Sequence, residues 1–171
     1  MFLNIRELEL GALPFDKKLG PGAIGVFDGK IRQAGLLEAK GVAELLTATE
    51  EIRIRGHMRV AMETECDRCL EAVSWPIDAD FDLLYRPEET APAEEDLEIW
   101  DEDMGVGYYE GSGLDLNEAF REFILLSIPM QQVCREDCRG ICPACGQNRN
   151  QMDCGCHPQM GDDRWSALKN L

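Results

Sequence analysis

Eight cysteines, arranged as four close pairs, constrain this chain more than any other feature of its sequence. The spacing within a pair is short, which is typical of metal-binding knuckles, because a tight turn points both sulfurs to one place. Four such pairs supply the ligands for two tetrahedral sites. The pairs are Cys66 with Cys69, Cys134 with Cys138, Cys142 with Cys145, and Cys154 with Cys156.

The start of the chain favours metal over disulfides. Charged Arg6, Glu7 and Glu9 stand where a secretory signal needs an apolar run. The longest apolar stretch, near Phe123 to Met130, is far too short to span a membrane. We therefore expect a soluble, cytoplasmic protein, and in a reducing compartment paired thiols favour metal.

Two partitions of the cysteines are open. The favoured partition lets the second site close locally, across a short loop. Its sites are Cys66, Cys69, Cys134 and Cys138 (site 1) and Cys142, Cys145, Cys154 and Cys156 (site 2). The alternative joins Cys134 and Cys138 to Cys142 and Cys145. His157 is an alternative ligand, although an exposed loop histidine is the favoured interpretation. Four thiolates without an open position predict structural Zn2+, and the spacing fits iron–sulfur motifs poorly.

Two runs of alternating apolar residues predict a pair of antiparallel strands. They extend from Ile52 to Met62 and from Val73 to Tyr85, and the segment ECDRCLEA forms the tip between them. The register then places Arg55 opposite Asp82 and Arg59 opposite Asp78. Arg53, Arg55, His57 and Arg59 form a basic stripe, and the facing aspartates Asp78, Asp80 and Asp82 cancel much of its field. We therefore favour a structural role for this stripe over RNA binding.

The charge of the chain is −16, which argues against unassisted binding to a phosphate backbone. Most of this negative charge lies in residues 86–118, which contain twelve acidic residues and a single basic one, Arg86. Residues 86–104 are predicted to form an acidic loop, and a solvated connector is favoured over a binding arm. Trp100, Tyr108 and Tyr109 indicate that the chain then returns to the core.

One main helix is predicted after the acidic loop. Asp115 and Glu118 form a capping-box signature, an apolar stripe follows over 116–128, and Pro129 ends it. A short second helix is expected to begin at Asp162 or Asp163, with Trp165 and Leu168 on one side. Further strands are predicted in 34–49 and in the first twenty residues.

These elements predict an α+β fold. Residues 1–130 form an antiparallel β-rich domain with the acidic loop (86–104) and a closing helix (116–128). Residues 131–171 form a cysteine-rich, loop-rich zinc segment with a short C-terminal helix.

The motifs of common enzymes lack their context. GPGAIG at 20–25 contains a proline and leads into a turn rather than a helix, so it predicts no dinucleotide site. The acids at 101–103 lack the other ligands of a calcium loop. We expect a protein that is not an enzyme and has no small-molecule substrate.

Several segments resemble the YceD-like proteins, the large ribosomal RNA subunit accumulation proteins. They are ECDRCLEAV, AFREFILLSIPMQQVC, CREDCRGICPACGQNRNQMDCGC and DDRWSALKNL. All eight cysteines follow the pattern of this family. The resemblance implies a non-enzymatic role in accumulation of 23S rRNA, that is, maturation of the large ribosomal subunit in the bacterial cytoplasm.

Two functions remain open. One is a ribosome-assembly factor that binds the large-subunit precursor, and the other is a zinc-ribbon adaptor of another complex, such as the transcription machinery. The acidic field favours a basic ribosomal protein as the first contact, with weaker rRNA contact near the cysteines. The candidate contact residues are Arg135, Arg139, Arg149 and Arg164. No membrane partner is expected.

Overall fold

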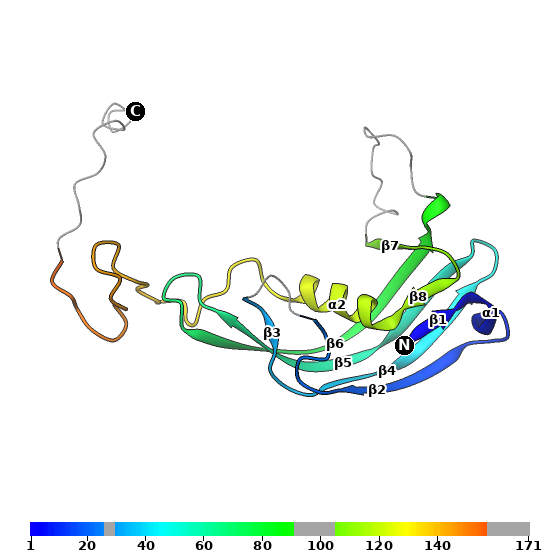
Figure 1. Ribbon diagram of the computed structural model, residues 1–171, viewed down its shortest axis with the longest axis horizontal. Helices are drawn as coiled ribbons and strands as arrows, with labels where there is room; N and C mark the ends of the chain where they lie inside the picture. The colour runs from blue at the N-terminus through cyan, green and yellow to red at the C-terminus, as the bar shows by residue number, and fades with distance from the viewer. Residues whose placement is uncertain (26–29, 91–104, 157–171) are drawn as a thin grey trace, which may run out of the picture. The chain divides into compact units, whose positions relative to one another are not determined.

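A computed structural model of the chain describes residues 1–25, 30–90 and 105–156 (Figure 1). Its elements are β1 (Phe2–Asn4), α1 (Ile5–Leu8), β2 (Leu13–Leu19), β3 (Arg32–Gln33), β4 (Leu37–Leu46), β5 (Glu51–Glu65), β6 (Ala72–Pro87), η1 (Glu88–Thr90), β7 (Val106–Tyr109), β8 (Gly113–Asp115) and α2 (Leu116–Ser127). The chain divides into two compact units. Residues 1–64 and 74–130 form the sheet unit, and residues 65–73 with the described residues from 131 onward form the cysteine unit.

The sheet unit is built on the two long strands that the alternation predicts. β5 and β6 are neighbours in a sheet of order β2-β4-β5-β6-β7, and β3 pairs with the end of β5. Alternate residues of β5 are buried, including Ile52, Ile54 and Met58. One face of the sheet therefore carries the core, and the opposite face carries charged side chains.

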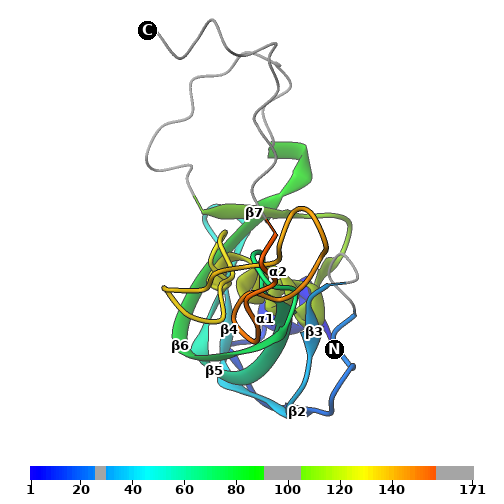
Figure 2. The ribbon, with the colours of Figure 1, turned by 90° about the vertical axis from the view of Figure 1, so that its left-hand side faces the viewer.

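Helix α2 covers the apolar face of this sheet, and Figures 1 and 2 show the sheet curved around it. As predicted, the Asp115 carboxylate caps the helix by accepting a hydrogen bond from the Asn117 backbone N–H (3.0 Å). Phe120, fully buried on α2, contacts the rings of Phe15 and Phe81 at centroid distances of 5.9 and 6.0 Å. The predicted amphipathic helix is thus confirmed as the second layer of the core.

A glycine pair makes room for this aromatic cluster. Gly41 of β4 and Gly56 of β5 lie opposite each other. A Cβ at Gly41 would lie 2.7 Å from the Phe15 ring, and one at Gly56 would lie 2.8 Å from the Phe81 ring. The two rings therefore lie over bare backbone.

The sequence predicts a wholly antiparallel sheet, and this prediction is wrong for one strand. β7 runs parallel to β6, pairing Leu84 with Val106 and Pro87 with Tyr109. The segment between these strands is long enough for the crossover that parallel pairing needs. Tyr109 is buried, and its hydroxyl donates to the Glu50 carbonyl (2.7 Å), so the chain does return to the core at this residue. Tyr108 of the same strand is exposed instead.

The cross-strand ion pairs agree with the prediction in part. Arg59 contacts Asp78 (2.8 Å), as expected. Arg55 instead contacts Glu44 of β4 (2.7 Å), while Arg53 is the partner of Asp82 (2.6 Å). The difference arises because β5 also has β4 as a neighbour, and β4 presents acidic side chains such as Glu44 to the arginines of β5.

Some predicted features lie outside the described residues. They are residues 91–104 of the acidic loop with Trp100, His157, Arg164, and the C-terminal helix with Asp162, Asp163, Trp165 and Leu168. The beginning of the predicted loop is regular instead, because Arg86 and Pro87 belong to β6 and residues 88–90 form η1. None of the described helices is long and apolar enough to cross a membrane.

Candidate metal centres

The turn between β5 and β6 carries Cys66 and Cys69, two residues of the first candidate metal centre. Its ends are closed by a hydrogen bond from the Cys66 N–H to the Glu71 carbonyl (2.8 Å), and the Leu70 N–H donates to the Cys66 carbonyl (2.9 Å). Leu70 takes a positive φ of 63°, which turns the chain sharply. This turn brings the sulfurs of Cys66 and Cys69 to the same side.

A second segment is bound to this turn by reciprocal hydrogen bonds. The Asp67 N–H donates to the Gln132 carbonyl (2.7 Å), and the Gln132 N–H donates to the Asp67 carboxylate (2.7 Å). The Arg68 guanidinium donates to the carbonyls of Glu136 (3.1 Å) and Cys138 (3.3 Å). These contacts place Cys134 and Cys138 beside the turn.

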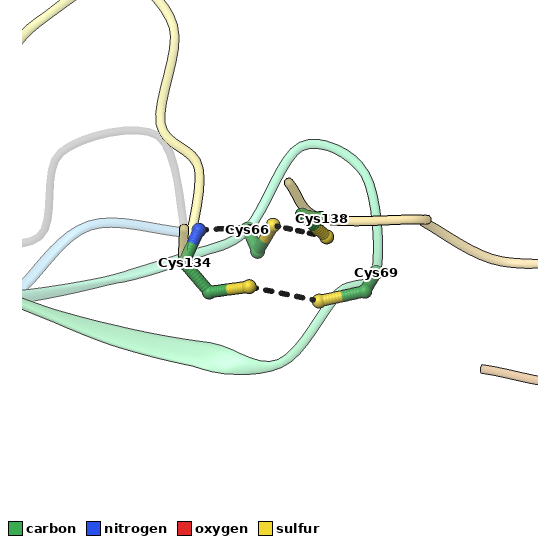
Figure 3. Close-up of side chains that lie close together, drawn as sticks. All are labelled: Cys66, Cys69, Cys134 and Cys138. Atoms are coloured by element: carbon green, nitrogen blue, oxygen red, sulfur yellow. Dashed lines mark hydrogen bonds between the residues drawn. The ribbon is translucent and has the colours of Figure 1, made fainter. Parts of the chain in front are cut away.

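The first cluster consists of Cys66, Cys69, Cys134 and Cys138 (Figure 3). All four sulfurs lie within 4.8 Å of one another, with Cys66–Cys138 at 3.9 Å and Cys69–Cys134 at 3.6 Å. A disulfide requires about 2.05 Å, so these are free thiols. A tetrahedron with Zn–S bonds of about 2.3 Å has S–S edges of about 3.8 Å. The observed spacings therefore fit a four-thiolate zinc site.

Hydrogen bonds to sulfur prepare this cluster for a cation. Burial opposes ionisation of Cys66, but N–H groups of Cys134, Cys69 and Arg68 outweigh it and lower the Cys66 pKa to about 6. By contrast, burial and the neighbouring thiols raise the pKa of Cys69. The Cys66 thiolate thus forms readily, whereas ionisation of Cys69 is favoured by the positive charge of a bound metal.

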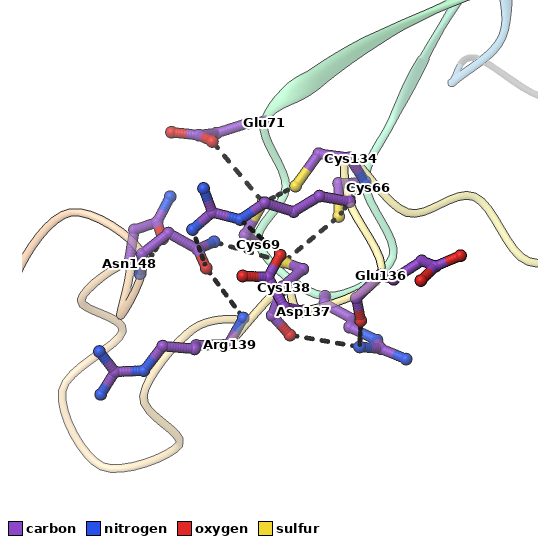
Figure 4. A network of polar contacts seen from close by, with 12 residues as sticks. Cys66, Cys69, Glu71, Cys134, Glu136, Asp137, Cys138, Arg139 and Asn148 are labelled. Atoms are coloured by element: carbon purple, nitrogen blue, oxygen red, sulfur yellow. Dashed lines mark hydrogen bonds and ion pairs between the residues drawn. The ribbon is translucent and has the colours of Figure 1, made fainter.

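Asn150 is a supporting residue that the sequence analysis missed. Its amide nitrogen donates to the Cys138 sulfur (3.3 Å), and this bond lowers the Cys138 pKa. Its amide oxygen accepts from the Arg139 N–H (2.8 Å) and the Arg135 guanidinium (3.0 Å). Figure 4 shows the polar contacts around this cluster. Asparagine-rich NRNQ indicates a turn, but no local pattern shows that one amide reaches a sulfur twelve residues away.

The second cluster consists of Cys142, Cys145, Cys154 and Cys156, whose sulfurs also lie within 4.8 Å of one another. The Cys142 N–H donates to the Gln147 carbonyl and the Gly146 N–H to the Cys142 carbonyl, both at 2.8 Å. N–H groups of Cys145 and Ala144 lower the Cys142 pKa to about 6. Contact with the Cys145 thiol raises the pKa of Cys156.

The clusters differ in exposure. In the first, only Cys134 is exposed, whereas in the second Cys145 and Cys156 are exposed and Cys142 alone is buried. The structure therefore groups the cysteines as in the favoured partition, with one enclosed cluster and one at the surface.

Two of the four arginines proposed to contact RNA already contact acidic side chains of this chain. Arg135 lies 3.3 Å from Asp137, and Arg139 forms an ion pair with Asp153. The Arg149 N–H donates to the Gly140 carbonyl (2.9 Å), and this residue borders a cavity beside the second cluster. Arg164 lies outside the described residues. Much of the arginine charge is thus offset by nearby acids.

A curved β-sheet covered by helix α2, together with two four-cysteine clusters, defines a class of small β-rich cysteine-cluster proteins. The family described as large ribosomal RNA subunit accumulation protein YceD matches residues 54–171, which include every cysteine. The chain therefore belongs to the YceD family.

Related proteins agree with this membership. An uncharacterized protein of Mycobacterium tuberculosis is 30% identical over 151 residues, which cover 88% of this chain and 69% of that protein. The chloroplastic large ribosomal RNA subunit accumulation protein YCED homolog 1 of Arabidopsis thaliana is 24% identical, over 75% of this chain and 46% of that protein. Its Zea mays counterpart is 25% identical, over 91% of this chain and 62% of that protein. No solved structure shows a significant match.

Proposed function

We propose that this chain is a non-enzymatic factor that supports accumulation of 23S rRNA during maturation of the large ribosomal subunit in the bacterial cytoplasm. The family match over residues 54–171 carries the proposal, because it includes most of β5 and all of β6, α2 and both cysteine clusters. The names of the plant relatives support the same process.

Each cluster holds one structural Zn2+ in this proposal. Four cysteine sulfurs complete the tetrahedral coordination that zinc prefers, so no position is left for a substrate or an activated water. The metal then stabilises the cysteine unit rather than taking part in a reaction. This donor set is the main support for a non-enzymatic role.

The factor acts on the large-subunit precursor through a basic ribosomal protein first. The chain carries a charge of −16, so a basic protein is attracted to it and an RNA backbone is repelled. Arg135, Arg139, Arg149 and Arg164 add a weaker rRNA contact, limited by the acids beside Arg135 and Arg139.

Depletion in a bacterium that encodes this chain tests the function. We expect the ratio of 23S to 16S rRNA to fall and to recover when the wild-type chain is supplied. Cys66→Ser or Cys142→Ser should fail to restore the ratio because each removes one of four ligands. Replacement of the four arginines by glutamine should restore it in part.

An unchanged 23S to 16S ratio after depletion would contradict the proposal. Changed transcript synthesis with normal ribosome ratios would instead support the zinc-ribbon adaptor. Crosslinking in cells, followed by sequencing of bound RNA and identification of bound proteins, distinguishes a protein contact from a direct rRNA contact.

A further inference from the structure

An apolar groove opens in the sheet unit between α2 and the β6–β7 edge. It has a volume of about 290 Å3. Leu83 of β6, Val106 of β7, and Phe123 and Leu126 of α2 line it. Leu126 is 83% exposed, although it lies on the helix that closes the core. Leu83, Val106 and Phe123 are partly buried, so the groove joins an exposed leucine to the edge of the core. An apolar groove that remains partly open to solvent is typical of a binding surface.

An unpaired strand edge leads to this groove. β7 pairs with β6 only from Leu84 to Pro87. Among the described residues, the outer edge of β6 from Ser74 to Leu83 pairs with no strand. Apart from Pro76, which lacks an N–H, this edge offers the backbone groups to which an extended peptide can bind.

The surroundings of the groove are acidic. Glu122 lines it and accepts a hydrogen bond from the Tyr85 hydroxyl (2.7 Å), and Glu118 lies one turn earlier on α2. At the far end of the parallel pair, contact with Glu110 raises the pKa of Glu88, as expected for two carboxylates held close together.

We propose that a basic segment of a partner protein binds here in extended conformation, along the outer edge of β6, with a large apolar side chain in the groove. This inference rests on the proposed function, for which it names the partner surface. A second copy of this chain fits poorly, because two acidic edges would repel each other. A basic segment matches the charge, the apolar lining and the free backbone groups together.

Two exposed leucines of the sheet unit provide a matched pair of variants. Leu126, in the groove, is 83% exposed, and Leu10, which follows α1, is 90% exposed. The variants Leu126→Lys and Leu10→Lys make the same change at similar exposure, and both should keep the wild-type unfolding temperature. Each full chain is applied to an array of short overlapping peptides that cover the large-subunit ribosomal proteins.

We expect the wild type and Leu10→Lys to bind peptides that combine positive charge with a large apolar residue. Leu126→Lys should bind them about tenfold more weakly or worse, because it removes an apolar contact and adds a like charge. The tightest peptide should also slow amide exchange at Ile77–Leu83, since it covers that strand edge.

The inference is wrong if Leu126→Lys binds like Leu10→Lys, if the bound peptides are neutral or acidic, or if no peptide binds. Unchanged amide exchange along β6 would rule out strand addition. Tight binding of naked 23S rRNA in place of the peptides would also overturn it. None of these results alters the 23S to 16S ratio measured after depletion, so the failure of this inference is distinct from failure of the proposed function.

Discussion

At the scale of single residues, backbone geometry and hydrogen bonds to sulfur hold the cysteine clusters in place. Gly140 adopts φ +70°, and a Cβ there would lie 2.8 Å from the Arg68 carbonyl oxygen. Gly146 adopts a similar φ of +72° but faces open space. Both positions require a left-handed backbone, but a side chain would clash with a neighbour only at Gly140. Comparing substitutions at the two glycines therefore distinguishes the two effects.

Gly140→Ala should destabilise the cysteine unit more than Gly146→Ala. The left-handed conformation costs alanine about 1–2 kcal/mol, which applies to both variants. At Gly140 the clash with the Arg68 carbonyl adds to this cost. Opening free energies from amide exchange of residues 138–149 provide the measurement. Equal losses in the two variants would show that the close approach to Arg68 is unimportant.

Asn150→Ala should weaken metal binding by the first cluster. It removes the hydrogen bond to the Cys138 sulfur and the contacts with Arg135 and Arg139. Loss of a residue that supports a metal ligand typically costs about 10–100-fold in affinity. Competition with a chromogenic zinc chelator measures the change, with Gln131→Ala, an exposed amide of the same unit, as the control. Similar zinc retention in both variants would contradict a supporting role for Asn150.

At the scale of secondary-structure elements, the outer face of β5 and β6 is an ordered array of opposite charges. His57 lies 2.8 Å from both Asp78 and Asp80, and Arg59 also contacts Asp78. These contacts are solvent-exposed, so each adds little to stability. Their main consequence is that the basic stripe on β5 is offset within the sheet.

The titration of His57 tests this array. The hydrogen bond to Asp80 is the largest cause that raises the His57 pKa above 6.5, and the bond to Asp78 adds to it. Asp80→Asn should therefore lower the His57 pKa more than Asp78→Asn does, as measured by NMR titration of the ring protons. The opposite order would mean that Asp78 is the dominant partner.

The sign of the linked stability follows from the same shift. A raised pKa means that protonated His57 is favoured in the folded chain. Its stabilising contribution is complete below about pH 6.5, the ordinary value for histidine, and is lost as the pH rises through the folded-state pKa. His57→Gln should remove this part of the pH dependence of unfolding.

At the scale of the whole molecule, the two units are stabilised by different means. The sheet unit has an extended apolar core that includes Phe15, Phe81 and Phe120. The buried cluster of the cysteine unit consists mainly of Cys66, Cys69 and Cys138, with Val73 and Val133 packed against it. Because its described residues bury so little apolar surface, we expect this unit to depend on the proposed zinc ions, which contribute about 10–16 kcal/mol in small zinc domains.

Removal of metal should therefore unfold the cysteine unit and leave the sheet unit folded. After chelation under reducing conditions, we expect fast amide exchange in residues 66–71 and 131–156 and unchanged protection in β4 and α2. Elemental analysis before chelation should find two zinc ions per chain. Full protection of the cysteine unit in metal-free protein would show that its own packing suffices.

Local patterns in the sequence determined the two long strands and the main helix of this protein. Alternation along β5 and β6 and the capped apolar stripe of α2 are visible locally, because burial on one face imposes the period of the element. The four cysteine pairs likewise indicated metal, since each pair lies within one turn. Even the grouping of the pairs into clusters was favoured from loop closure alone.

Only the tertiary structure decided which distant groups meet. The parallel pairing of β7 with β6, the choice of Glu44 by Arg55, and the bond from Asn150 to Cys138 all join residues that no local period relates. Such contacts depend on how the strands and loops pack in three dimensions. The groove has the same origin, because packing of the elements brings together Leu83 of β6, Val106 of β7 and Leu126 of α2.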